Sequence, residues 1–142
     1  MSQPEEYDVL VLGSGTGGKL IAWTMASEGK RTASIERKYV GGACPNIACL
    51  PSKNVIHSAK VASLFGRHQE FGIETGPFTV NMAGVSTRKK KMVDELMKVH
   101  LDQYRTSGAE LIWGRLNLLD RVLSRWLCAT AANAHLSVSA YS

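Results

Sequence analysis

The chain has no long apolar run, and its first residues lack the features of a targeting signal. A membrane-spanning helix needs about 20 consecutive, mostly apolar residues, and no stretch of the sequence has that character. The N-terminal segment Met1–Glu6 is acidic and has no apolar core, which a secretory signal requires. These absences predict a cytoplasmic protein with no membrane partner.

Cysteine is also scarce, and so is clustered charge of one sign. The 142 residues include 3 cysteines, too few for a scaffold held together by disulfides. The formal net charge is +5, but the basic residues are scattered except in the run Arg88–Lys91. This run is followed by apolar residues at helical spacing and predicts a solvated helix face. A nucleic-acid surface would interleave Lys and Arg with aromatic residues, so no nucleic-acid partner is expected.

What the chain contains is the material of one globular α/β domain. Its content of 44% hydrophobic and 20% charged residues is ordinary for a globular protein. Two short strands, Tyr7–Leu12 and Arg31–Glu36, flank a helix over Lys19–Glu28 and form one βαβ unit. The elements expected after this unit are a helix over 44–65, a loop over 67–77, a helix over 82–106 and a strand over 109–113.

The first motif is the glycine-rich turn Gly13–Gly18, which fits the pattern G-x-G-x-x-G. In a nucleotide-binding βαβ unit the first glycine makes a tight turn and the second lets the backbone approach a pyrophosphate. The third allows close helix–strand packing. Glu36 ends the next strand, about 20 residues further on, where a carboxylate can accept from ribose hydroxyls. The motif therefore predicts a dinucleotide site, with a purely structural turn as the alternative.

The second motif contains two cysteines, Cys44 and Cys49, at the predicted start of a long helix. Residues at this spacing lie about one helical turn apart, so the two sulfurs can meet after modest distortion. The positive end of the helix dipole and the nearby Lys53 favour a lowered thiol pKa and a reactive thiolate. Two inert cysteines remain an alternative. So does a metal site, although His57 is the only other ligand in this segment.

With both motifs in hand, the chain resembles the FAD-dependent pyridine nucleotide–disulfide oxidoreductases. The resemblance rests on Gly13–Gly18 with Glu36 and on the segment GGACPNIACLPSK, residues 41–53, and it covers about residues 5–114. The second segment looks most like the mercuric-reductase-like and dihydrolipoamide-dehydrogenase-like members. The resemblance implies an α/β, Rossmann-like FAD/NAD(P)-binding domain of which this chain is the N-terminal part.

The resemblance also implies roles for individual residues. The residues implied to contact FAD are Gly13, Gly15, Gly18, Glu36, Gly42, Cys44, Lys53 and Gly114. Cys49 is implied to be the sulfur nearest the flavin and Cys44 the interchange thiol that attacks substrate. Lys53 is implied to sit beside the reactive nitrogen of the flavin. Hydride from NAD(P)H would pass through the flavin to the Cys44–Cys49 disulfide, and full-length members form homodimers.

The sequence departs from the family pattern in two places. Ala48 stands where a glycine is usual before the second cysteine, which adds a methyl group beside the redox pair. After Gly114 the pattern stops, and the stretch Arg115–Ser142 contains no Gly, Lys, Pro or Glu. One interpretation is an ordinary amphipathic helix over Leu116–Leu127. Another is a frame change near residues 115–125 that leaves an atypical tail over 115–142.

These observations favour an FAD-dependent oxidoreductase that uses NAD(P)H and the Cys44–Cys49 pair. The substrate would be mercuric ion, lipoamide or another disulfide. A nucleotide-binding fragment without turnover is the first alternative, because family members run to several hundred residues. A small thiol-redox protein without flavin is the second alternative. The sequence does not decide between NADH and NADPH.

Overall fold

The computed structural model describes residues 5–118, 123–128 and 133–138, with side chains up to Arg115. The described chain forms two compact units. The first comprises Met1–Gly42 and Met97–Ser142, and the second comprises Ala43–Leu96. The helix α4, Met82–Ser107, contributes its C-terminal part to the first unit and its N-terminal part to the second. None of the described helices has the length and apolar character needed to cross a membrane.

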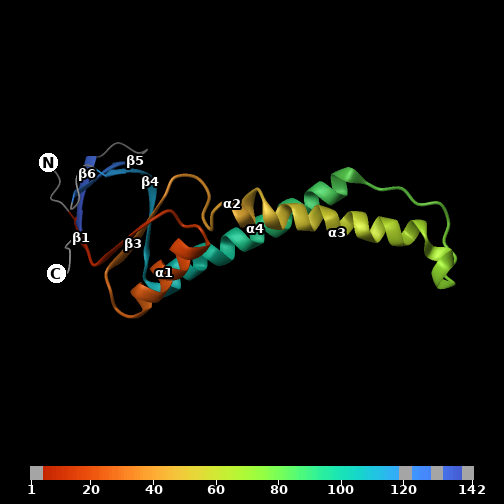
Figure 1. Ribbon diagram of the computed structural model, residues 1–142, viewed down its shortest axis with the longest axis horizontal. Coiled ribbons are helices and arrows are strands. Elements are labelled where there is room, and N and C mark those ends of the chain that lie inside the picture. Colours follow the sequence, from red (N-terminus) through yellow and green to blue (C-terminus); the bar gives the residue numbers. More distant parts are fainter. Residues whose placement is uncertain (1–4, 119–122, 129–132, 139–142) are drawn as a thin grey trace. The chain divides into compact units, whose positions relative to one another are not determined.

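The first unit is built on one sheet with the strand order β1-β6-β5-β4-β3-β2. The strands β2, β3 and β4 run parallel, β5 pairs antiparallel with β4, β6 pairs antiparallel with β5, and β1 pairs parallel with β6. Figure 1 shows α1 beside these strands. The bounds are β1 Glu5–Tyr7, β2 Val9–Leu12, α1 Thr16–Ser27, β3 Thr32–Glu36, β4 Glu110–Leu118, β5 Leu123–Cys128 and β6 Asn133–Val138.

The strand β3 lies at the centre of the packing, and all five of its residues are buried. This pattern is typical of a parallel strand covered on both faces. Ala33 and Ile35 pack with Tyr7 into one apolar cluster. The hydroxyl of Ser34 accepts a hydrogen bond from Tyr104 of α4 at 3.1 Å, and Tyr104 belongs to a second cluster that includes Ala22 of α1. The two clusters hold β3 between α1, α4 and its neighbouring strands.

Helices α1 and α4 are also joined by a polar contact. The ammonium Nζ of Lys19 lies 2.7 Å from Nε2 of His100, whose ring is buried. Burial and the Lys19 charge both lower the pKa of His100, so the neutral imidazole accepts from the ammonium. The Trp23 ring lies beside His100 and Tyr104, with centroid distances of 5.9 and 5.6 Å. The contact therefore sits within the second apolar cluster.

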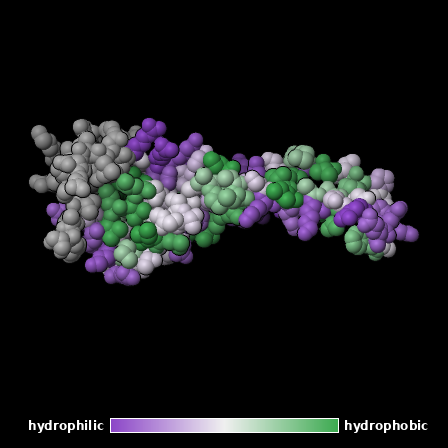
Figure 2. Space-filling model, viewed as in Figure 1, coloured by the Kyte–Doolittle hydropathy of each residue, from purple (hydrophilic) through white to green (hydrophobic). Residues whose placement is uncertain are grey.

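The second unit contains α2 Ala43–Asn46, α3 Cys49–Gly66, a short 3-10 helix His68–Phe71 and the first part of α4. The guanidinium of Arg88 donates to the backbone oxygen of Asn54 and to the hydroxyl of Ser58 at 2.7 Å, which ties α4 to α3. In the run Arg88–Lys91 all residues except Lys89 are exposed, which agrees with the prediction that this run forms a solvated helix face. Apolar side chains, green in Figure 2, are visible on the surface of both units.

Several predicted boundaries were wrong. The predicted strand over 7–12 is interrupted at Asp8, because β1 pairs with β6 whereas β2 pairs with β3. The predicted helix over 44–65 is two helices, since Ala48 has φ −119° and ψ −97°, outside helical values. The predicted strand over 109–113 continues through Gly114 to Leu118.

The amphipathic helix predicted over Leu116–Leu127 is also wrong. The described part of this range belongs to β4 and β5, which pair antiparallel with Gly114 opposite Cys128. Pairing with an existing sheet edge satisfies backbone groups that a lone helix would have to satisfy internally. The domain boundary at residue 114 and the frame change stay predictions, and residues 119–122, 129–132 and 139–142 lie outside the described residues.

Candidate functional site

The glycine-rich loop connects β2 to α1. Gly13 has φ +85°, a conformation that favours glycine, and its N–H donates to the Ile35 carbonyl at 2.8 Å. Gly15 is the N-cap of α1 and makes no side-chain cap, and the first turn of the helix contains no acidic residue. The N–H groups at the start of α1 therefore remain without a side-chain acceptor, which is the arrangement that binds a phosphate.

The third glycine explains why this loop is so tight. A Cβ placed on Gly18 would lie 2.2 Å from the Gly13 carbonyl oxygen and 3.1 Å from Cγ1 of Val11. A Cβ on Gly15 or Gly17 would meet nothing within 4 Å. Gly18 is thus required for the packing of α1 on β2, whereas the position that a Cβ of Gly15 would occupy faces open space. This division matches the roles that the G-x-G-x-x-G pattern predicts, although contact with a cofactor stays a prediction.

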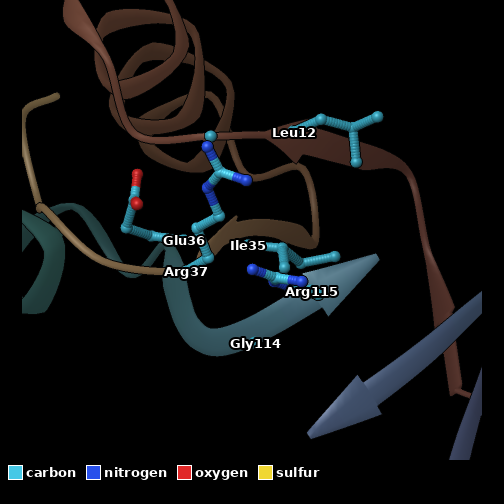
Figure 3. A pocket seen from close by; sticks show the side chains of 7 residues that line it. Leu12, Ile35, Glu36, Arg37, Gly114 and Arg115 are labelled. Atoms are coloured by element: carbon cyan, nitrogen blue, oxygen red, sulfur yellow. The ribbon is translucent and has the colours of Figure 1, made fainter. Parts of the chain in front are cut away.

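A pocket of about 470 Å³ opens at the carboxyl ends of β2 and β3, beside the middle of β4 (Figure 3). Ligands of open parallel sheets bind at this edge. The pocket brings together three predicted site residues that are distant in sequence, Gly13, Glu36 and Gly114. Sequence reasoning missed the others. The full lining is Leu12, Gly13, Ile35, Glu36, Arg37, Gly114 and Arg115.

Glu36 is buried, and its carboxylate is turned away from Arg115 (Figure 3). Its Oε2 accepts from the N–H and the hydroxyl of Ser14 at 3.0 and 2.7 Å. Its Oε1 accepts from the N–H groups of Lys38 and Tyr39 at 2.8 and 3.0 Å. Burial raises the pKa of Glu36, but these donors outweigh burial and hold the pKa below its usual value. The group is therefore an ionised acceptor at neutral pH.

A second loop, which contains Gly41 and Gly42, closes on the first. Gly42 has φ +81°, and a Cβ there would lie 2.9 Å from the Cα of Gly15. The Gly42 N–H donates to the Tyr39 carbonyl at 2.8 Å, and the Gly41 N–H donates to the Ser14 hydroxyl at 3.2 Å. The predicted cofactor residue Gly42 thus lies directly against the predicted phosphate residue Gly15. These features together fit a dinucleotide.

The predicted redox residues Cys44, Cys49 and Lys53 lie in the second unit. Both cysteines are free, Cys49 is exposed and Cys44 is partly exposed. A hydrogen bond joins the two thiols and raises the pKa of Cys44, burial adds to this effect, and the Lys53 charge opposes it. The prediction of a lowered thiol pKa is therefore wrong for Cys44, because contact with the second sulfur outweighs nearby positive charge. The raised pKa lowers the fraction of Cys44 that is present as the nucleophilic thiolate at neutral pH.

Alkylation of Cys44 should consequently be slow at pH 7 and should rise only at a higher pH than for an ordinary cysteine thiol, because only the thiolate reacts. The measurement is the rate of iodoacetamide modification of the Cys44 peptide in a C128A chain, followed by mass spectrometry across pH. In a C49A/C128A chain the hydrogen bond that raises the pKa is gone, so the curve should move to lower pH. Identical curves in the two chains would contradict the assignment.

Among the residues whose side chains are described, no three His, Cys, Asp or Glu side chains gather as a metal site. His57, the predicted third ligand in the alternative metal interpretation, lies on α3 and is exposed. Cys44 and Cys49 are present as two free thiols. Their chemistry in this structure is that of two thiols able to form one disulfide.

Residues 7–116 match the family model described as pyridine nucleotide-disulphide oxidoreductase. The dihydrolipoyl dehydrogenase of Bacillus subtilis is 41% identical over 91 residues, which are 64% of this chain and 19% of that enzyme. The glutathione reductase of a Nostoc species is 32% identical, over 81% of this chain and 25% of the relative. The mercuric reductase of Lysinibacillus sphaericus is also 32% identical, over 82% of this chain and 21% of that enzyme.

A solved structure, the Cu(II) complex of the HOCl-induced flavoprotein disulfide reductase RclA from Escherichia coli, shares the fold. The TM-score is 0.76 at 23% identity, and the match covers 94% of this chain and 27% of that protein. The chain thus spans about a fifth to a quarter of the length of the relatives that it matches.

Proposed function

Because the chain belongs to the pyridine nucleotide-disulphide oxidoreductase family, we propose that it carries the FAD-binding loop and the redox disulfide of an NAD(P)H-dependent reductase. One observation carries this proposal above the rest. A single chain holds both an uncapped glycine loop built for a dinucleotide and a hydrogen-bonded thiol pair, Cys44 and Cys49. The relatives named dihydrolipoyl dehydrogenase, glutathione reductase and mercuric reductase match this chain in sequence.

In this proposal the glycine loop holds the pyrophosphate of FAD on the free N–H groups at the start of α1. Glu36 accepts from the adenosine ribose, and Gly42 and Gly114 let the cofactor approach the backbone. Cys44, Cys49 and Lys53 complete the predicted cofactor contacts. When bound, FAD supplies a carrier that takes hydride from NAD(P)H and delivers electrons to sulfur. The chain's own part is to bind, orient and exchange thiols.

The thiol chemistry balances with NAD(P)H as reductant. Two electrons and two protons convert the Cys44–Cys49 disulfide into the dithiol. With a disulfide substrate, the Cys44 sulfur attacks one substrate sulfur after losing its proton, and the first substrate thiol leaves. The Cys49 sulfur then attacks Cys44, which releases the second substrate thiol and restores the disulfide. A mercuric ion would instead bind the two sulfurs in place of their protons, accept two electrons that come from NAD(P)H, and leave as Hg(0).

The alternative is a nucleotide-binding fragment without turnover. The observation that favours it is the share of the relatives that the chain spans, a fifth to a quarter. A cytoplasmic location and a homodimer of the full-length enzyme remain part of the leading proposal.

The test is to refold the chain with FAD and to measure flavin retention, then NADH or NADPH oxidation with a disulfide dye or Hg(II). Retained flavin and turnover that is lost in C49A but kept in C128A would support the reductase. Flavin retention without turnover would support the fragment. A chain that retains no flavin would contradict both.

A further inference from the structure

The strand β2 lies at one end of the sheet that the described strands form. It pairs in parallel with β3, from Val9 opposite Thr32 to Leu12 opposite Ile35. Its sequence VLVL is a continuous apolar run, which is typical of a strand within a buried parallel sheet. Among the described strands, however, none lies on the second edge of β2, which we call the open edge.

The register shows which backbone groups face the open edge. The N–H groups of Val9 and Gly13 donate to carbonyl groups of the segment 31–35, at 3.3 and 2.8 Å. In a parallel ladder, residues that bond to one neighbouring strand alternate with residues whose N–H and C=O point to the other side. The N–H and C=O groups of Leu10 and Leu12 therefore point away from β3, toward the open edge.

Apolar side chains flank the open edge. In α1, a Cβ on Gly18 would lie 3.1 Å from Cγ1 of Val11, so this side of the helix faces β2. Trp23 lies on the side of α1 that contacts α4, the helix that covers β3. Helical spacing places Ile21 on the opposite side, above the open edge, and Ile21 is 53% exposed. Leu12 is 56% exposed. An added strand would cover this surface.

The place of β2 in the sheet indicates what would pair there. In a doubly wound sheet, the strand that leads into the glycine-rich loop is central, the strand order reverses beside it, and the nucleotide lies in the crevice at that point. The spatial order β4-β3-β2 is one half of such an arrangement. The relatives offer a source for the other half, because this chain spans only 19% to 25% of their length.

We propose that the open edge of β2 accepts a parallel strand of apolar residues from a polypeptide segment outside these 142 residues, and that this strand forms the second wall of the nucleotide crevice. Leu10 and Leu12 exchange backbone hydrogen bonds with the strand, and its side chains cover Ile21. The contribution of the strand to nucleotide binding rests on the proposed function, whereas the strand pairing does not.

The test is amide hydrogen exchange of the full chain, alone and in complex with a second polypeptide. This probe is the part of the Bacillus subtilis dihydrolipoyl dehydrogenase that lies outside its match to this chain, co-expressed and co-purified. In the chain alone, the Leu10 and Leu12 amides should exchange about tenfold faster than those of Val11 and Gly13, which pair with β3. In the complex they should slow by about tenfold or more.

Two variants of Leu12 isolate the backbone contact. Leu12→Pro removes one N–H that points to the open edge, and proline is tolerated in an edge strand when its nitrogen faces solvent. This variant should fold but bind the second polypeptide about tenfold more weakly, because one hydrogen bond is lost. Leu12→Ala keeps the N–H and is the matched control, so it should bind as the native chain does. Equal binding by the two variants would overturn the pairing.

The exchange data separate the remaining outcomes. Slow exchange of Leu10 and Leu12 in the chain alone, at every concentration, would show that the edge is closed and would overturn the inference. Slow exchange that develops as the chain is concentrated would assign the edge to a second copy and would overturn it too. Fast exchange in the complex, or two polypeptides that do not co-purify, would have the same meaning. Protection in the complex without retained flavin would leave the strand standing and contradict the proposed function.

Discussion

Replacing Gly18 with alanine is expected to destabilise the first unit by about 3 kcal/mol or more, a large part of the stability of a small domain. The added Cβ would lie 2.2 Å from the Gly13 carbonyl oxygen, which belongs to the backbone and cannot rotate away. Gly13 is itself held by its hydrogen bond to Ile35 of β3, so relief of the clash would separate α1 from the sheet. Urea unfolding followed by circular dichroism measures the loss.

Gly17→Ala is the matched control for this prediction. Gly17 precedes Gly18 in α1, and a Cβ there would meet nothing within 4 Å. Alanine is favoured over glycine within a helix by up to about 1 kcal/mol, so this variant should be as stable as the native chain or slightly more so. If the two variants unfold at the same urea concentration, the close packing of Gly18 is not what holds the loop.

Replacing Gly15 with alanine should have the opposite effect: the chain should stay folded, but its affinity for FAD should fall. The backbone of Gly15 has φ −59° and ψ 178°, which alanine adopts without strain, and its Cβ would face open space. The cost in stability should stay near or below about 1 kcal/mol, the usual effect of alanine at an N-cap. A methyl group in the place of an approaching pyrophosphate should weaken FAD binding about a hundredfold.

The measurement is a fluorescence titration with FAD, run beside urea unfolding of the same preparation. Gly17→Ala again serves as the control, since both changes add one methyl group within the glycine-rich segment Gly13–Gly18. Native affinity in G15A would show that the pyrophosphate does not pass over Gly15. A loss of affinity accompanied by unfolding would show that the loop is less open than its geometry indicates.

Sequence reasoning succeeded where the information is local. A short β-branched run that ends in glycine, followed by a helix and a second strand, predicts a βαβ unit because these patterns act within a few residues of one another. The structure has that unit as β2, α1 and β3. The two motifs were recognised for the same reason, since G-x-G-x-x-G and the pair Cys44–Cys49 are short and continuous.

It failed where the outcome depends on partners from elsewhere in the chain. The strand over 7–12 is divided at Asp8 because its two halves pair with different strands, and no local pattern encodes that choice. The thiol pKa prediction considered a helix dipole and one lysine but not the hydrogen bond between the two thiols. One of the two interpretations of the tail was an amphipathic helix over Leu116–Leu127, whereas the described residues of that range pair with the sheet edge as strands.

The sequence by itself therefore determined the family, the α/β fold class, the glycine loop and the cysteine pair. Only the tertiary structure brought Gly114 and Arg115 to the pocket beside Glu36, through the parallel pairing of β3 with β4. It alone revealed that Ser14 and two backbone amides occupy the carboxylate expected to hold a ribose. The physical reason is that turn and helix preferences act between near neighbours, whereas hydrogen-bond partners and pocket walls depend on which strands pair and in what register.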